Sequence, residues 1–296
     1  MKQQNDVTEN WFQKAVDILH ERGDRFYELR YFKTIDSTNE AVKRAAAEGA
    51  AEGLVIVGEE QTAGKGRRGR NWKSPAGESV YMSVLLKPVL PVEALSELTL
   101  VMGLSVAQAV SGLYGLDAAI KWPNDIVIRG KKICGILTEL IPERTHRGTG
   151  SAPDAAPDTT GSNPGTPAPC SIVIGTGINV NNTAFPAELA DKAVSLRMIR
   201  GEKTSRGRVL AETLLCFRDN YRICLRTGDL SGIQEAYNSR LISRGRPVRI
   251  EDPRGPYTGI SRGIDTSGRL IVERSDGKVE AISSGEVSVR GLYGYV

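Results

Sequence analysis

The segment Gly64-Lys65-Gly66-Arg67-Arg68-Gly69-Arg70, followed by Trp72, stands between two strand-like runs, residues 54–57 and 80–86. Glycines let a backbone pass close to a ligand, and four cations within seven residues repel one another unless an anion joins them. The segment therefore predicts a site for a phosphate or carboxylate group. A solvated basic loop and a nucleic-acid patch are the alternatives that composition leaves open.

The segment does not fit two common nucleotide-binding patterns. No Gly-Lys-Ser/Thr follows it, so it is not a Walker loop. Gly64-x-Gly66-x-x-Gly69 formally matches the Rossmann pattern, but Trp72, Ser74-Pro75 and then a strand follow where that pattern requires a helix. The context therefore disfavours a Rossmann dinucleotide site.

Outward from this segment, strand-like and helical runs are mixed. The runs 29–35, 126–128, 133–140 and 172–174 predict strands, with a turn at Arg129-Gly130. Apolar spacing predicts helices after Thr8 and over 205–225 and 230–241, and the uncharged run 98–116 predicts a core helix rather than a membrane span. The fold class we expect is α+β, a mixed β-sheet flanked by helices.

Composition divides the chain. Residues 142–169 are mostly Pro, Gly, Ser, Thr, Ala and Asp, which predicts a disordered insertion across which sheet pairing continues. After residue 244 short strands alternate with turns at Ser267-Gly268 and Asp276-Gly277. We expect a first domain over 1–243 and a small barrel-like β-domain over 244–296.

Bulk composition excludes several classes of protein. The 296 residues carry 39 Lys+Arg against 35 Asp+Glu, a net charge of +4 that is too small for a protein coated with nucleic acid. Four cysteines and two histidines have no metal-ligand spacing, and no export signal is evident, so we expect a cytoplasmic protein. One helix before the strand at 29–35 is too little chain for a helix-turn-helix, so DNA is not an expected partner.

Three further segments are informative mainly because they occur in the same chain as the basic segment. Lys121-Trp122-Pro123-Asn124-Asp125 and Lys131-Lys132 would each, alone, be ordinary turns. Ser37-Thr38-Asn39-Glu40 predicts a capping box, Ser37 with Glu40, that opens a helix running through Ala47.

Together these segments resemble the biotin protein ligase family. The match extends from about Phe32 to the C-terminus and is carried by Ser37-Thr38-Asn39, Gln61 to Arg70 with Trp72, Lys121 to Asp125, Lys132 to Leu140, Gly175 to Asn181, and Ser284-Gly285-Glu286 with Arg290. The resemblance implies a class II synthetase-like catalytic domain followed by an SH3-like β-barrel. It also implies an enzyme that makes biotinyl-5′-AMP from biotin and ATP and passes biotin to a lysine of a biotin carboxyl carrier protein.

The resemblance assigns roles to individual residues. It implies catalytic roles for Lys132, Arg67 and Arg70, whose charges would offset the repulsion between carboxylate and phosphate, and a place near Mg²⁺ for Asp125. The implied biotin contacts are Ser37, Thr38, Asn39, Gln61, Gly64, Lys65, Gly66, Arg67, Lys132 and Gly135. The implied ATP contacts are Arg67, Arg68, Arg70, Trp72, Asn124, Lys132, Asn179 and Arg290.

This chain departs from the family pattern in places. Lys65 stands where Arg is usual, which keeps the charge but loses the planar fork. No DNA-binding domain precedes the catalytic region, so we expect a ligase without a repressor role, a monomer or homodimer that binds no membrane. Lipoate protein ligase is the nearest alternative, and a non-enzymatic RNA or single-strand binding protein is the alternative from another class.

Overall fold

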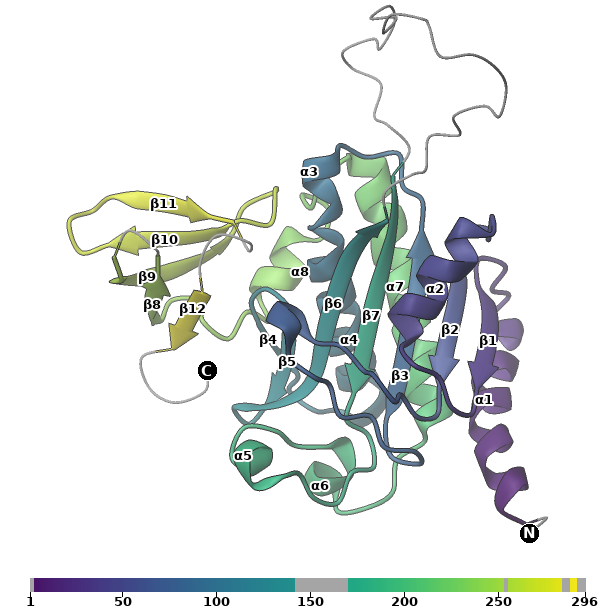
Figure 1. Ribbon diagram of the computed structural model, residues 1–296. Helices are drawn as coiled ribbons and strands as arrows, with labels where there is room; N and C mark the ends of the chain where they lie inside the picture. The colour runs from purple at the N-terminus through teal and green to yellow at the C-terminus, as the bar shows by residue number, and fades with distance from the viewer. Residues whose placement is uncertain (1–2, 142–169, 253–254, 284–287, 292–296) are drawn as a thin grey trace, which may run out of the picture.

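The computed structural model describes residues 3–141, 170–252, 255–283 and 288–291 of the chain. Its largest element is a seven-stranded sheet in the order β1-β2-β3-β7-β6-β5-β4 (Figure 1). β1 and β2 are parallel, and the other neighbouring pairs are antiparallel, so the sheet is mixed as predicted. Its strands are β1 Glu28–Phe32, β2 Leu54–Gly58, β3 Val80–Leu86, β4 Ala119–Lys121, β5 Asp125–Ile128, β6 Lys131–Ile141 and β7 Ser171–Ile178.

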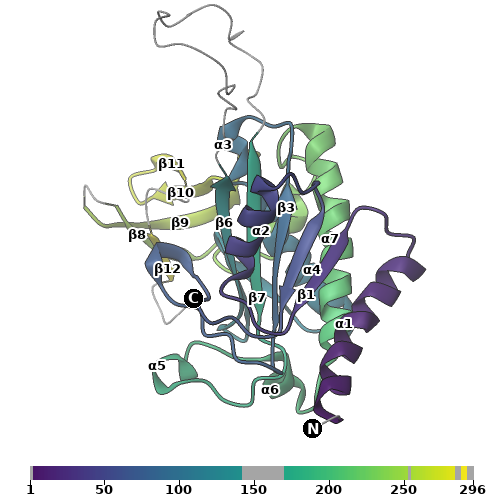
Figure 2. The same cartoon turned by 45° about the vertical axis from the view of Figure 1, so that its right-hand side comes forward.

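Helices cover both faces of this sheet. α1, α4 and α7 lie on one face, and α2 crosses the other (Figures 1 and 2). Strand alternation makes this possible: in β3, Val80, Met82 and Val84 join the larger core, whereas Leu85 packs beneath α2. The helices are α1 Gln3–Glu21, α2 Thr38–Ala47, α3 Val92–Leu95, α4 Leu98–Tyr114, α5 Ala187–Ala190, α6 Leu196–Arg200, α7 Arg206–Thr227 and α8 Gln234–Asn238.

The uncharged run is a core helix, as predicted. Most of α4 is buried, between the sheet and α7. It ends at Gly115, whose φ of 64° is left-handed and suits glycine. Within the described parts of the chain, none of the helices has the length and apolarity that crossing a bilayer requires.

Strand pairing continues across the insertion, which confirms that prediction. The whole of β7 pairs antiparallel with residues 134–141 of β6, and Ile141 is the partner of Ser171. The predicted disordered insertion, 142–169, lies outside the described residues. Its two attachment points are therefore neighbours in the sheet.

Replacing residues 142–169 by a short turn should leave the fold and the activity nearly unchanged, because adjacent strand ends need only a few residues to connect them. Thermal unfolding and the initial rate of biotin-dependent pyrophosphate release would measure this. A shortened chain that unfolds, or that loses most of its rate, would show that the insertion contributes to the core or to the site.

The C-terminal strands form a separate five-stranded antiparallel sheet in the order β11-β10-β9-β8-β12. The arrangement is SH3-like, but over the residues that the structure describes the sheet is not closed into the expected barrel. The predicted turns at Ser267-Gly268 and Asp276-Gly277 are present, with φ of 70° and 81° at the glycines. The predicted helix 230–241 is shorter than expected, because only α8 is helical there. The strands are β8 Pro247–Glu251, β9 Tyr257–Ile264, β10 Leu270–Arg274, β11 Val279–Ile282 and β12 Ser288–Gly291.

Specific contacts join this small sheet to the rest of the molecule. The indole of Trp122 donates a hydrogen bond to the carbonyl of Gly268 at 3.0 Å, and the backbone N–H of Leu230 donates to the carbonyl of Thr266 at 2.9 Å. Because so small a module has a thin core of its own, these contacts help to stabilise it.

Glu97 lies at this junction and gives the stability a pH dependence. Burial, with Asp229 and Asp265 nearby, raises the pKa of Glu97 to about 7, while Arg269 opposes the shift. An acid with a raised folded pKa favours folding below its unfolded pKa, and this contribution is lost as the pH rises through 7. Glu97→Gln should therefore stabilise the protein at pH 8, by about 1 kcal/mol after allowance for screening, and change little at pH 5. Denaturant midpoints that respond to pH identically in variant and wild type would contradict this.

Candidate active site

One pocket lies on the α2 face of the large sheet, between the start of α2, the segment 61–72 and strands β6 and β7. It is a partly open hollow of about 460 Å³, a volume that includes solvent at its mouth. Its walls are formed by Ser37, Thr38, Asn39, Gln61, Lys65, Gly66, Arg67, Trp72, Asn124, Lys132, Gly135, Ile136, Leu137, Gly175, Thr176 and Gly177.

Glycines make the floor of the pocket flat. A β-carbon on Gly135 would lie 2.8 Å from the Trp72 ring, and one on Gly177 would lie 2.7 Å from it. On Gly175 it would lie 2.1 Å from the side-chain oxygen of Asn39. Because these positions carry no side chain, Trp72 and Asn39 can lie directly on the strands.

The basic segment folds into a small hairpin at the rim. The N–H of Gly66 donates to the carbonyl of Arg70 at 2.7 Å, and that of Trp72 donates to the carbonyl of Gly64 at 2.9 Å. At the tip, the short 3₁₀ turn η1 (Arg67–Gly69) places Arg68 at a φ of 57°, a left-handed conformation unusual for a side chain of that size.

Cationic groups gather at one end of the pocket. Lys132 Nζ lies 2.6 Å from Asp125 Oδ1 and 5.3 Å from the centroid of the Trp72 ring. Arg67 donates to Asn124 Oδ1 at 2.7 Å. Burial lowers the pKa of Arg67, although Asp125 opposes this, and an arginine remains charged at neutral pH. This end is suited to an anion.

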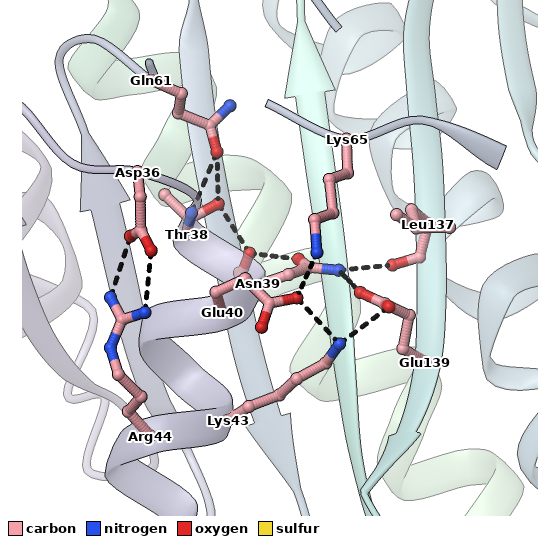
Figure 3. Close-up of polar contacts among 11 residues, drawn as sticks. Asp36, Thr38, Asn39, Glu40, Lys43, Arg44, Gln61, Lys65, Leu137 and Glu139 are labelled. Atoms are coloured by element: carbon pink, nitrogen blue, oxygen red, sulfur yellow. Dashed lines mark hydrogen bonds and ion pairs between the residues drawn. The ribbon is translucent and has the colours of Figure 1, made fainter. Parts of the chain in front are cut away.

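The other end is lined mainly by uncharged hydrogen-bonding groups, and the Lys65 ammonium beside them is paired with Glu40 (Figure 3). Gln61 Oε1 accepts from the backbone N–H and the hydroxyl of Thr38 at 2.9 and 3.1 Å. Ser83 Oγ lies 2.7 Å from Thr38 Oγ1 and 2.5 Å from Asn39 Oδ1. These groups suit a neutral polar ligand rather than an ion.

The predicted capping box is wrong. Ser37 is the N-cap residue of α2, but its side chain makes no capping hydrogen bond. The Glu40 carboxylate instead bonds Lys43 at 3.0 Å and Lys65 at 2.7 Å (Figure 3). These hydrogen bonds, to Lys65 and then Lys43, lower the pKa of Glu40. The Glu40 carboxylate is therefore bonded to a lysine of the basic hairpin and does not form the capping box.

The structure brings most of the predicted residues together. Those that line the pocket are Ser37, Thr38, Asn39, Gln61, Lys65, Gly66, Arg67, Trp72, Asn124, Lys132 and Gly135. Gly64, Arg68, Arg70, Asp125 and Asn179 are not in its walls. The amide of Asn179 donates to the carbonyls of Lys132 and Val194, and the side chain of Arg290 lies outside the described part. The ligand contacts of all these residues stay predictions.

Sequence reasoning missed several groups. Gly175, Thr176 and Gly177 line the floor; this Gly-Thr-Gly run in an apolar strand was part of the resemblance but was given no ligand role. Ser83 was equally visible as the one polar residue among apolar neighbours in β3. Glu139, which accepts from Asn39 Nδ2 at 2.7 Å, gave no such signal because polar residues are common near strand ends.

Comparison with known proteins identifies the family. A model of the biotin/lipoate A/B protein ligase family matches residues 31–149, and one of the biotin protein ligase C-terminal domain matches residues 244–290. The bifunctional ligase/repressor of Bacillus spizizenii is 35% identical over 88% of this chain and 74% of its own length. The chain belongs to the biotin protein ligase family. The biotin–[acetyl-CoA-carboxylase] ligase of Mycobacterium tuberculosis is 32% identical over 92% of both chains.

A solved structure has the same fold as this member of the family. The biotin protein ligase of Aquifex aeolicus, in complex with biotin and ATP, aligns with a TM-score of 0.72 and 29% identity over 90% of this chain and 100% of that one. The similarity includes both sheets. The expected class II synthetase-like domain with an SH3-like C-terminal module is therefore confirmed.

Proposed function

We propose that this chain joins biotin and ATP into biotinyl-5′-AMP and transfers biotin to a lysine of a biotin carboxyl carrier protein. The observation that carries the proposal is the division of one pocket into an uncharged hydrogen-bonding end and a cationic end. Biotin has the same division, with a neutral ureido ring and a carboxylate. The relatives named as biotin ligases support the same conclusion.

The uncharged end would hold the ureido ring. Thr38 and Gln61 present fixed polar atoms there. The biotin carboxylate would then point toward Lys132 and Arg67. Binding at both ends orients the carboxylate for attack, which lowers the entropic cost of the reaction.

The cationic end would carry the first chemical step. The carboxylate oxygen attacks the α-phosphate, forming the acyl–phosphate bond while the bond to pyrophosphate breaks. Both reactants are anions, so Lys132 and Arg67 would lower the barrier by offsetting negative charge that builds in the transition state. Trp72 offers a flat face for adenine.

The second step would transfer the biotinyl group to the carrier. A deprotonated lysine amine attacks the acyl carbon, the amide bond forms, the nitrogen releases a proton to solvent, and AMP leaves with the electron pair of the broken acyl–phosphate bond. Water would destroy this mixed anhydride, so the hairpin at 64–72 would protect it by covering the pocket. The ion pair between Lys65 and Glu40 holds the hairpin against α2.

Magnesium would enter with the nucleotide as part of the substrate. Within the described ranges, the His, Cys, Asp and Glu side chains form no group of three that could hold a metal ion, and the Asp125 carboxylate bonds Lys132. Magnesium commonly binds through phosphates, water and at most one or two carboxylates. The metal contact predicted for Asp125 stays a prediction, as do cytoplasmic location, a monomeric or homodimeric state and the absence of DNA binding.

The test is to incubate the chain with ATP, Mg²⁺ and biotin and to look for biotinyl-5′-AMP by mass spectrometry, with lipoate in a parallel reaction. The proposal expects the biotin adenylate and biotin-dependent pyrophosphate. Preferential formation of the lipoate adenylate would instead favour the lipoate alternative. Retention on nucleic acid at moderate salt, with no pyrophosphate release, would favour the binding-protein alternative.

A further inference from the structure

A chain of polar groups runs away from the pocket behind Thr38 and ends at Glu139 (Figure 3). Asn39 Nδ2 donates to Glu139 Oε2 at 2.7 Å and to the carbonyl of Leu137 at 3.4 Å. Lys43 Nζ donates to the other carboxylate oxygen of Glu139 at 2.8 Å. Burial opposes the charge of Lys43, but the hydrogen bonds that it donates to Glu139 and Glu40 outweigh burial and raise its pKa. Glu139 therefore faces Asn39 as a paired carboxylate.

The carboxylate fixes which way Asn39 faces. An ionised carboxylate only accepts hydrogen bonds, so Asn39 must turn its amide nitrogen toward Glu139. Its oxygen then faces Ser83 Oγ at 2.5 Å. An amide oxygen only accepts as well, so the single hydroxyl proton of Ser83 is directed at Asn39.

The same orientation of hydrogen bonds continues to Thr38. Its single hydroxyl proton has two acceptors inside the protein, Ser83 Oγ at 2.7 Å and Gln61 Oε1 at 3.1 Å. Gln61 itself is fixed, because its oxygen accepts the Thr38 N–H and its nitrogen donates to Ser74 Oγ at 2.8 Å. Thr38 lines the pocket and so offers lone pairs, not a proton, to a ligand.

We propose that Glu139 is a positioning residue that acts through Asn39 and Ser83 to make Thr38 a hydrogen-bond acceptor for a ureido N–H. The proposal rests on the proposed function and deepens it, since it gives the pocket a preference for cyclic ureas. Lipoate has a dithiolane ring in place of the cyclic urea. Because this ring has no N–H to donate to Thr38, the same arrangement disfavours lipoate. Desolvated polar groups left without a partner discriminate strongly between such ligands.

The test uses Glu139→Gln, with Glu48→Gln as the matched control. A glutamine can donate to Asn39, so Asn39 can turn round and Ser83 can direct its proton at Thr38. Glu48 follows the last residue of α2 and is exposed. Calorimetric titration should show biotin affinity about tenfold lower in Glu139→Gln, with ATP affinity and the rate at saturating biotin within twofold of wild type.

A double-mutant cycle separates this role from a general structural one. Thr38→Val removes the acceptor, so adding Glu139→Gln to it should cost little further biotin affinity. Ser83→Ala breaks the chain without touching the ion pair, and it should lower biotin affinity to a similar extent if Glu139→Gln does not fold. Biotin affinity equal to the Glu48→Gln control, or losses that add fully in the cycle, would overturn the proposal. A wild-type chain that does not bind biotin would instead overturn the proposed function.

Discussion

Lys132→Ala should lower the rate of adenylate formation by about 100- to 1,000-fold, the usual effect of removing a preorganised charge from a transition state. Lys132 stands at the cationic end of the pocket, 2.6 Å from Asp125. Its ammonium group would offset charge shared between the attacking carboxylate and the α-phosphate. Single-turnover formation of biotinyl-5′-AMP measures the chemical step, and a melting curve checks that the fold survives.

Lys131 provides a matched control for this variant. It is the preceding residue in β6, but its ammonium group donates to the carbonyl of Ala190, and it is not in the pocket wall. Lys131→Ala should therefore retain most of the rate. Wild-type turnover in Lys132→Ala would remove this residue from the mechanism.

A second variant distinguishes lost positive charge from unmasked negative charge. Removing Lys132 leaves the Asp125 carboxylate without its 2.6 Å partner beside the incoming anions. If catalysis needs the ammonium group itself, Lys132→Ala with Asp125→Asn should stay as slow as Lys132→Ala. A double variant that regains most of the rate would show that Lys132 acts mainly by neutralising Asp125.

Gly64→Ala should reduce kcat/KM by about 100-fold, because a misplacement of about 1 Å near the reacting groups has an effect of that size. A β-carbon at residue 64 would lie 2.3 Å from the backbone oxygen of Trp72 and 2.9 Å from Ser74 Oγ. Backbone cannot rotate aside, so the hairpin must move and carry Arg67 and Trp72 with it. The kinetic constants and the release of free adenylate into solution would both report this movement.

Gly69 in the same hairpin is the control. Its φ is 71°, and a β-carbon there would meet no atom within 4 Å. Gly69→Asn keeps a residue that tolerates this conformation and should leave kcat/KM within a fewfold of wild type. Equal losses in the two variants would mean that the hairpin tip, rather than the contact at Gly64, sets the activity.

The fold could be predicted where local pattern and tertiary packing agree. The short apolar run of residues 80–86 and the turn at Arg129-Gly130 predict strands without reference to distant partners. The strand order could not be predicted. The parallel pairing of β1 with β2 depends on how α2, which connects these two strands, packs on the sheet. The length of α8 was also overestimated, because the residues on either side of it form turns rather than helix.

The site, like the fold, could be predicted only where its residues belong to local motifs. The resemblance brought eleven of the pocket residues together in advance, because they belong to motifs. The capping box failed because Lys65, distant in sequence, bonds Glu40. The polar chain from Thr38 to Glu139 was invisible for the same reason, since it joins α2, β3 and β6 only in the folded state.

The position of Trp72 gives the protein an intrinsic optical reporter. Of its three tryptophans, Trp11 donates to Glu59 in the interior and Trp122 is bonded to the C-terminal sheet, whereas Trp72 lies in the pocket wall beneath an ammonium group. Its emission is therefore the one that occupancy of the pocket should perturb. Ligand association could be followed in real time by unlabelled fluorescence, with Trp72→Phe as the dark reference.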